Sequence, residues 1–361
     1  MRSPSRRDLS RWPDAREENR YPRHGGARVR RSSPNRIPRR SSKRSILPAM
    51  MRLRVGTLLV SITLAAAVWA DARARSYLAP VSEDPAARTT IVGRVYRHTV
   101  QPGETLLDIA RKYDMGITEL QTFYPNLDQW LLEEGSVLQI PAFWILPAAK
   151  GEGIVINVPE LRLYYFIAKY GAIWTYPVTI GEKETPTPIG TFRVVEKAVD
   201  PTWNIPERLQ HKYEEKSMPP GGDNPIGKYW LGLSRERYGI HGTDNAWSVG
   251  RIISNGCIRL YPEDMEILFP EAPKETVVDI VYQPVKFGFR RGEIFIEVHE
   301  DIYGRIKNLD RHTRALAKKM GIEDSVDWEE VRMALHEKSG VPVPVGAPAE
   351  GGGGEQSARH R

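Results

Sequence analysis

The chain has 361 residues, with 52 Lys and Arg against 45 Asp and Glu, a net charge of +7, and one cysteine. One cysteine excludes an intramolecular disulfide, and this length exceeds what a single core usually fills, so we expect two or three domains. The charge is uneven: residues 1–50 hold 15 Lys and Arg against 4 Asp and Glu, a net of +11, and the rest of the chain has a net of −4. The basic character therefore belongs to the first fifty residues.

Residues 1–50 are rich in Arg, Ser and Pro and poor in apolar residues, so we expect them to be disordered. A basic tail of this kind can bind nucleic-acid phosphates. We prefer a simpler interpretation, in which the start codon is mis-called and Met50 or Met51 is the true initiator. We therefore expect no nucleic-acid partner.

Residues 51–74 have the layout of a secretory signal peptide. Arg52 and Arg54 form a positive start, residues 55–68 are uncharged and mostly apolar, and small residues at 70–74 offer cleavage sites. The apolar stretch is shorter than the ~20 residues that span a bilayer, although an uncleaved anchor stays open as an alternative. We expect an exported protein, located in the periplasm, where a lone cysteine has no internal partner for oxidation.

Residues 75–96 are predicted to be a linker, followed by a small β-α-α-β unit over 97–141. Thr105 and Asp108 form a plausible capping box for the first helix, and Thr118 with Gln121 is predicted to cap the second. With PGETL at 102–106 and YPN at 124–126, the unit resembles a LysM domain. The resemblance implies binding of glycans that contain N-acetylglucosamine; a purely structural role is the alternative.

Residues 153–282 contain short β-rich runs between Gly and Pro turns, which predicts a β-sandwich-like domain. The predicted strands include 173–180, 190–195, 228–234 and 276–282, and a helix is predicted over 262–269. A polar stretch over 203–227 is long enough to be functional. The whole chain is thus predicted to be multidomain and mainly β.

Cys257 and His241 are the candidate catalytic pair in this domain. A thiol beside a glycine at a turn, with a histidine upstream, suits nucleophilic acyl transfer. Cys257 would attack a carbonyl, and His241 would remove the thiol proton and then protonate the leaving amine. Gly242 would orient His241 through its carbonyl, and N–H groups around Gly256 and Cys257 would hold the oxyanion. A buried structural cysteine and an unrelated histidine are the plain alternative.

The motifs HGT at 241–243 and SNGCIR at 254–259 closely resemble the signature of the L,D-transpeptidase catalytic domain of the YkuD type. The likeness extends over about 153–282 and includes GIVINV at 153–158, LRLYY at 161–165, TPTPIGTF at 185–192 and GGDNPIG at 221–227. The resemblance also implies that 203–227 caps the active site.

The resemblance implies peptidoglycan as partner and substrate. The enzyme would cleave between diaminopimelate at position three and D-Ala at position four of a stem peptide, through a thioester. The acceptor would be another diaminopimelate, giving a 3–3 cross-link, or the C-terminal lysine of an outer-membrane lipoprotein. With water as acceptor the enzyme would be an L,D-carboxypeptidase. A non-catalytic protein that binds the wall through LysM is a further alternative.

Four residues are candidates for substrate binding. Arg259 would bind a substrate carboxylate or stabilise the thiolate, with a structural ion pair as the equal alternative. Ser254 is expected to hydrogen-bond locally, and Asn255 has no essential role. Tyr229 is expected to line the cleft, as is His211. We expect no metal and no cofactor, since neither a clustered ligand spacing nor a phosphate-binding glycine motif is present.

Residues 285–338 are predicted to form a short α/β extension with a strand at 293–299 and helices at 305–320 and 327–336. The Pro- and Gly-rich residues 339–361 are predicted to be a disordered tail. The sequence supplies no chemical role for this extension and no oligomeric state.

Overall fold

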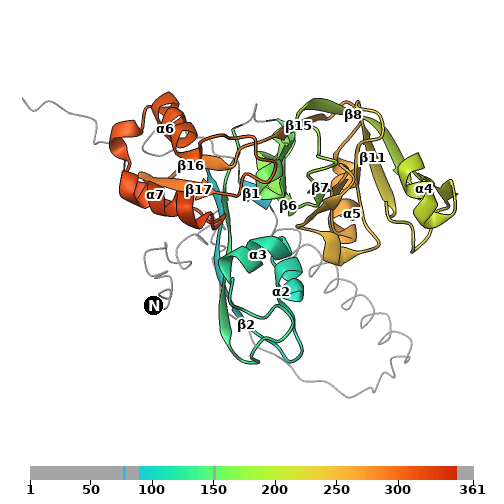
Figure 1. Cartoon of the computed structure of the whole chain (residues 1–361), viewed down its shortest axis with the longest axis horizontal. Helices are drawn as coiled ribbons and strands as arrows, with labels where there is room; N and C mark the ends of the chain where they lie inside the picture. Colours follow the sequence, from blue (N-terminus) through green and yellow to red (C-terminus); the bar gives the residue numbers. More distant parts are fainter. Residues whose placement is uncertain (1–75, 79–88, 149–151, 348–361) are drawn as a thin grey trace, which may run out of the picture. The chain divides into compact units, whose positions relative to one another are not determined.

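The computed structural model describes residues 76–78, 89–148 and 152–347, apart from the side chains at positions 208 and 212. The predicted basic extension (1–50), the predicted signal peptide (51–74) and part of the predicted linker lie outside the described residues. Among the described residues, no helix is both long and apolar enough to cross a membrane. The described chain is mainly β, as expected, with short helices near both of its ends (Figure 1).

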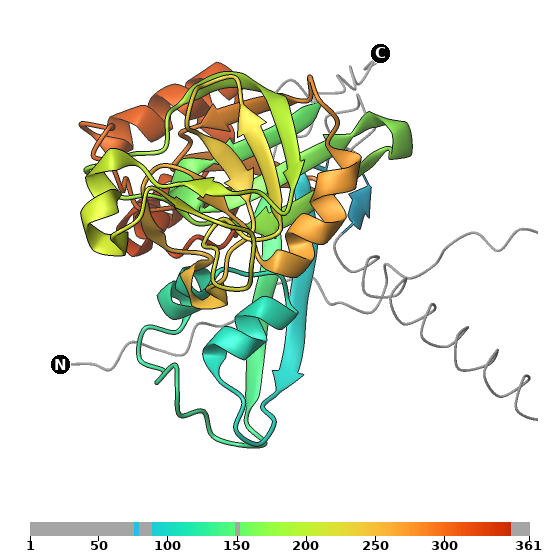
Figure 2. The ribbon, with the colours of Figure 1, turned by 90° about the vertical axis from the view of Figure 1, so that its right-hand side faces the viewer.

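The predicted β-α-α-β unit is present. Strands β2 (Ile91–Thr99) and β3 (Val137–Ile145) pair antiparallel along their whole length. Helices α2 (Leu106–Lys112) and α3 (Ile117–Phe123) pack on one side of this β2–β3 hairpin (Figures 1 and 2).

The predicted linker over 75–96 is wrong at both of its ends. Strand β1 (Ser76–Leu78) pairs with strand β6, and residues 91–96 belong to β2. Ile91 and Val92 are buried, because β3 continues to Ile145 and provides a partner for each of them. This long-range pairing has no local signature in the sequence.

The two helix caps have different outcomes. Thr105 and Asp108 form the predicted capping box at the start of α2. The predicted cap at Thr118 is wrong, because α3 begins earlier, with Gly116 as its N-cap. The Glu119 carboxylate accepts from the Gly116 N–H at 2.5 Å, which satisfies one of the unpaired donors of the first turn.

One nine-stranded sheet forms the body of the second domain. Its order is β1, β6 (Ala172–Pro177), β5 (Arg162–Ile167), β4 (Gly153–Asn157), β15 (Val277–Val281), β8 (Gly190–Val199), β11 (Tyr229–Leu233), β12 (Gly239–His241) and β14 (Ile258–Arg259). The pairs β4–β15 and β12–β14 are parallel, and the other neighbours are antiparallel.

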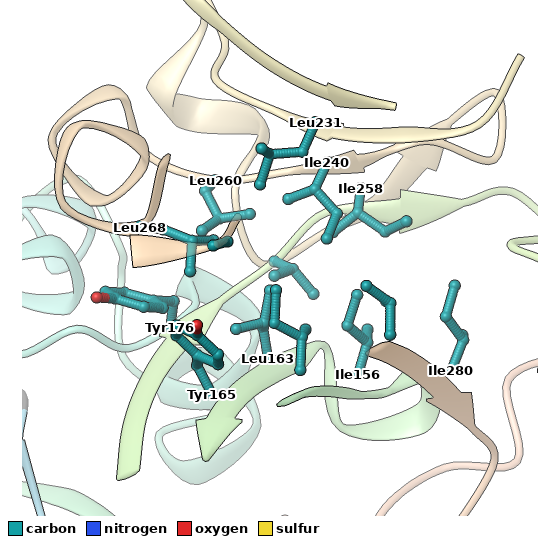
Figure 3. Close-up of a cluster of buried hydrophobic side chains, with 14 of the residues drawn as sticks. Ile156, Leu163, Tyr165, Tyr176, Leu231, Ile240, Ile258, Leu260, Leu268 and Ile280 are labelled. Atoms are coloured by element: carbon teal, nitrogen blue, oxygen red, sulfur yellow. The ribbon is translucent and has the colours of Figure 1, made fainter. Parts of the chain in front are cut away.

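This sheet folds around one apolar core, which gives the sandwich-like arrangement that was predicted. Figure 3 shows Leu231, Ile240 and Ile258 on one side of the core, and Ile156, Leu163 and Ile280 on the other. Helix α5 (Pro262–Glu271) adds Leu268 to the same core and begins at a proline, as predicted. Ile240 of β12 and Ile258 of β14 belong to this core, so both strands are anchored by packing, and the residues at their ends are held in place.

The stretch over 203–227 contains strand β9 (Trp203–Asn204), helix α4 (Glu207–Tyr213) and strand β10 (Ser217–Met218). Strands β9 and β10 pair antiparallel, and the rings of Trp203 and Tyr213 meet edge to face at 5.0 Å. We call residues 203–227 the capping segment.

The C-terminal extension is a three-stranded sheet with two helices beside it (Figure 1). Its elements are β16 (Val285–Arg290), β17 (Glu293–Val298), α6 (Leu309–Met320), α7 (Trp328–Glu337) and β18 (Val343–Gly346). The prediction of a disordered tail from 339 is wrong at β18, which pairs with β17. Val341 and Val345 are buried there, so a Pro- and Gly-rich composition conceals a short strand.

Two buried ionic contacts join these parts. Arg162 of β5 is fully buried and lies 2.7 Å from Glu119 of α3, with its guanidinium 3.8 Å from the ring centroid of Trp144. Further along, the Lys286 ammonium lies 2.7 Å from both Glu160 and Glu297.

Candidate active site

A cleft of about 670 Å³ opens beside the ends of strands β11, β12 and β14 and is bordered by the capping segment. Of the predicted site residues, it is lined by His241, Ser254, Asn255, Cys257 and Arg259. The capping segment contributes Trp203, Ile205 and Tyr213, among others. The structure therefore brings the thiol and the imidazole to one cavity.

Cys257 lies in the turn between β13 (Ile252–Ser254) and β14. Gly256 has a φ of +103°, a backbone conformation that disfavours other residues. A Cβ at Gly256 would also lie 2.7 Å from the ring of Tyr238. The Cys257 thiol is partly exposed and donates to the carbonyl of Arg237 at 3.5 Å. Only glycine fits this turn, so Gly256 sets the direction of the nucleophile.

Ser254 supports the same turn from within. Its hydroxyl donates to the Cys257 carbonyl at 2.6 Å and accepts from the Gly256 N–H at 3.0 Å. This agrees with the expected local bonding of Ser254. It corrects the expected role of Gly256, because an N–H that already donates inside the turn is not pointed at a substrate oxyanion.

His241 is buried at the end of β12, where it pairs in parallel register with Arg259 of β14. Its Nδ1 donates to the carbonyl of Gly242 at 2.6 Å, the contact that was expected from Gly242. A carbonyl oxygen can only accept, so this bond places a proton on Nδ1, and in the neutral imidazole the lone pair is then on Nε2. The imidazole is thus in the tautomer that can accept a proton.

Burial is the largest cause that lowers the pKa of His241, the nearby Arg259 guanidinium adds to it, and the net pKa is about 3. Backbone hydrogen bonds with Gly242 and Ile226 raise the pKa and offset part of this effect. The imidazole is therefore neutral at physiological pH. A neutral imidazole with a free Nε2 acts as a proton acceptor, whereas a protonated one would not.

Arg259 is largely buried behind the thiol. Burial lowers its pKa, while the electrostatic interactions with Cys257 and Asp244 raise it. Its Nε is buried and has no hydrogen-bond partner among the residues that the structure describes. A cation close to a sulfur favours the ionised form, so the Arg259 guanidinium is a candidate for stabilising a thiolate at Cys257.

Two predicted residues are not in the cleft. Tyr229 is half-buried and its ring packs against Phe269 of α5 at 4.8 Å, so the expectation that Tyr229 lines the cleft is wrong. Side chains alternate along a strand, and the next residue, Trp230, faces the cleft instead. His211 on α4 is exposed and does not line the cleft either.

Trp230 and Glu196 were missed by the sequence analysis. The Trp230 ring stacks on His241, with ring centroids 5.6 Å apart, and its Nε1 donates to Glu196 Oε2 at 3.2 Å. The alternation along 229–233 was the one signal that could have identified Trp230. No local pattern distinguishes Glu196, because its place depends on the pairing of β8 with β11.

A second group of ligand-type side chains lies outside this cleft. Glu160, Glu297 and His299 are buried with their ligand atoms within 4.8 Å of one another. The Lys286 ammonium bonds both carboxylates, so it provides the positive charge that a metal ion would bring. Burial raises the pKa of Glu160, but attraction to Lys286 and His299 and the hydrogen bonds from Lys286 and Tyr164 together outweigh burial and leave that pKa lowered.

Comparison with known proteins places both domains. The YkuD model, the L,D-transpeptidase catalytic domain, matches residues 151–280, and the LysM domain model matches residues 98–141. Among solved structures, the catalytic domain from Enterococcus faecium L,D-transpeptidase aligns with 37% of this chain and all of that chain, at 23% identity and a TM-score of 0.29.

Two curated relatives align over nearly their whole length. The "Probable L,D-transpeptidase YcfS" of Escherichia coli K12 is 32% identical over 313 residues, which cover 82% of this chain and 97% of that protein. The "Probable L,D-transpeptidase YbiS" of the same strain is 31% identical over 310 residues, which cover 81% and 99%. The chain therefore belongs to the L,D-transpeptidase family and is an enzyme with a LysM domain and a YkuD catalytic domain.

Proposed function

We propose that this protein is a cysteine-dependent L,D-transpeptidase that acts on the tetrapeptide stems of peptidoglycan. The observation that carries the proposal is the shared cleft of Cys257, His241 and Arg259, with the imidazole held in its proton-accepting tautomer. Family membership supports the reaction class, while the roles of the individual residues are our proposal.

The first half of the reaction forms a thioester. His241 Nε2 removes the proton of Cys257, and the sulfur attacks the carbonyl carbon of diaminopimelate at position three. The tetrahedral intermediate collapses as the imidazolium protonates the amine of D-Ala, which leaves. The N–H of Cys257 would donate to the developing oxyanion, and Arg259 would stabilise the thiolate.

The second half transfers the acyl group to an amine. The neutral His241 removes a proton from the incoming nitrogen, which attacks the thioester carbonyl and releases the Cys257 thiol after proton return. The acceptor would be diaminopimelate of a second stem, giving a 3–3 cross-link, or the C-terminal lysine side chain of an outer-membrane lipoprotein. With water as acceptor, the same acyl-enzyme gives a carboxypeptidase.

The LysM domain would hold the glycan strands of the same polymer. A second hollow of about 360 Å³ lies on this domain and is lined by Gln121, Tyr124, Pro125, Leu127, Asp128, Gln129 and Trp130. Trp130 is 53% exposed, and an exposed aromatic ring beside amide and carboxylate groups suits a sugar ring. Together with the predicted signal peptide over 51–74, these features support action in the periplasm.

The test combines product analysis with a covalent probe. Purified protein is incubated with tetrapeptide muropeptides, with and without a lysine-ended peptide, and separately with a carbapenem, a class that acylates the cysteine of this family. We expect release of D-Ala, an amine-dependent product, and a carbapenem adduct on Cys257 by intact-protein mass spectrometry. Since Cys257 is the one cysteine of the chain, the adduct is assigned without ambiguity.

The Cys257→Ala variant should lose all three results. Trp247→Phe is a matched control, because Trp247 is an exposed residue that does not line the cleft. Release of D-Ala by the alanine variant would overturn the proposed nucleophile. Release of D-Ala that is unchanged by any amine would instead identify the carboxypeptidase.

A further inference from the structure

Trp230 lies directly across from His241 on the neighbouring strand. The two residues are register partners in the antiparallel pair of β11 and β12, so their side chains project from the same face of the sheet. Their rings are stacked, with an interplanar angle of 29° and a centroid distance of 5.6 Å. The indole therefore covers one face of the imidazole.

The indole rests on a pair of glycines. Gly232 and Gly239 are also register partners in β11 and β12. A Cβ at Gly239 would lie 2.5 Å from the Trp230 ring, and a Cβ at Gly232 would lie 2.9 Å from Trp230 Nε1. Neither glycine has a positive φ, so the backbone does not require glycine here. What excludes a side chain at each place is the indole or its partner Glu196.

Glu196 holds the other end of the indole. Trp230 Nε1 donates to Glu196 Oε2 at 3.2 Å, and Glu196 comes from β8, the strand on the far side of β11. The ring is thus supported by three strands. The Trp230 side chain has two rotatable bonds. Its Nε1 is bonded to Glu196 and its ring lies on Gly232 and Gly239, so it has little freedom to move away from His241.

The imidazole needs such support. Its hydrogen bonds are to backbone groups, with the Nδ1 donation to the Gly242 carbonyl at 2.6 Å and a further bond at Ile226, and they hold the edge of the ring but leave its face uncovered. A rocking ring would move Nε2 away from the thiol and admit water. The charged group that acts on the pKa of the imidazole is Arg259, from β14 on the other side of β12.

We propose that Trp230, held by Glu196 on the Gly232–Gly239 platform, is a positioning residue that keeps His241 in the plane needed for proton transfer and shields it from water. This inference rests on the proposed function, because it concerns the base of that mechanism. Trp230 itself exchanges no proton and forms no bond with the substrate.

The experiment measures the first-order rate of Cys257 acylation by a saturating carbapenem, as a function of pH, in the full folded chain. His241 accepts the proton only while it is neutral, so wild-type acylation should stay fast as the pH falls towards 4, since the pKa of His241 is about 3. In Trp230→Ala, water reaches the imidazole and its pKa moves back towards ~6.5. The pH at which the acylation rate falls to half its plateau on the acidic side should therefore increase by at least about one pH unit. The plateau rate itself should decrease by about 10- to 100-fold.

Three further variants separate positioning from a general loss of structure. Gly239→Ala keeps the indole, but its new Cβ displaces the ring from its place on the two glycines. We therefore expect this variant to slow acylation and to shift the acidic fall in rate to higher pH. Trp230→Phe keeps an aromatic ring over His241 and should retain the wild-type limb. Trp247→Phe, an exposed tryptophan outside the cleft, should match the wild type throughout.

Wild-type rates and limbs in both Trp230→Ala and Gly239→Ala would overturn the inference. So would slower acylation with an unmoved acid limb, because that result is what plain loss of packing produces. The proposed function is tested separately by Cys257→Ala: D-Ala release by that variant removes the function, whatever Trp230 does.

Discussion

Gly256 illustrates how single residues determine the site. Its φ of +103° and the Tyr238 ring both exclude a side chain beside the nucleophile. Ser254 then closes the turn with two hydrogen bonds, so the direction of the Cys257 side chain is set by its immediate neighbours. The glycine that appears in the sequence as a flexible element is, in the structure, a steric requirement.

We expect Gly256→Ala to lose most of its acylation activity and to lower the free energy of unfolding by about 2–4 kcal/mol, since backbone strain and a clash add. Gly292→Ala is the matched control, because Gly292 has a φ of +76° and nothing within 4 Å of the new Cβ. It should lose only about 1 kcal/mol and keep full activity. Chemical denaturation and the carbapenem adduct measure both quantities, and equal effects in the two variants would contradict this account.

At the scale of elements, the C-terminal extension supports the nucleophile turn. Tyr303 follows β17 and donates from its hydroxyl to the Gly181 carbonyl at 2.6 Å, while the hydroxyl accepts from the Thr187 N–H at 3.2 Å. The Thr187 hydroxyl in turn donates to the Gly256 carbonyl at 3.0 Å. The C-terminal extension, for which the sequence indicated no chemical role, is thus connected to the turn at Gly256 by two successive hydrogen bonds through Thr187.

Tyr303→Phe should therefore reduce acylation of Cys257 by about 3- to 10-fold, with a loss of about 1–2 kcal/mol in the free energy of unfolding. The aromatic ring and its packing remain, so the change isolates the hydroxyl. Tyr170→Phe is a suitable control, because Tyr170 is exposed in the turn between β5 and β6, does not line the cleft and should change neither quantity. An unchanged acylation rate in Tyr303→Phe would show that the extension does not support the turn.

At the scale of the whole molecule, the LysM domain is packed against the catalytic domain rather than attached only through its linker. The buried Arg162 bonds Glu119 of α3 and stacks on Trp144, whose Nε1 donates to Glu119 Oε1 at 3.0 Å. The next residue of the hairpin bonds the C-terminal extension, because the Ile145 N–H donates to Glu297 at 2.6 Å. We expect the three parts to unfold together in one cooperative transition.

Removing one partner of the buried pair should be far more costly than removing an exposed one. Glu119→Ala leaves the Arg162 charge buried without its carboxylate and should cost about 3–5 kcal/mol, with LysM unfolding first. Arg111→Ala breaks the exposed pair of Arg111 with Glu263 and should cost less than about 1 kcal/mol. Calorimetry distinguishes one transition from two; a small effect of Glu119→Ala would show that the domains are independent.

Much of this arrangement could be predicted from the sequence. Short-range signals were sufficient for the Thr105–Asp108 cap and for the start of α5 at Pro262, because each depends on residues within one turn of helix. The motif residues Cys257 and His241 stand in recognisable local patterns. The family could therefore be identified before any coordinates were available.

The failures share a physical cause, which is that long-range pairing decides where a strand ends and which face it presents. Strands β1 and β18 and the start of β2 exist because strands distant in the sequence pair with them. Tyr229 was predicted to line the cleft, but its neighbour Trp230 does so, because the pairing of β11 decides which of its two faces is turned towards the cleft. The sequence by itself determined the family, the candidate nucleophile Cys257 and the turn at Gly256. Only the tertiary structure decided that a tryptophan and a glutamate from two further strands surround the imidazole, since contacts across a sheet depend on register and not on neighbours in the chain.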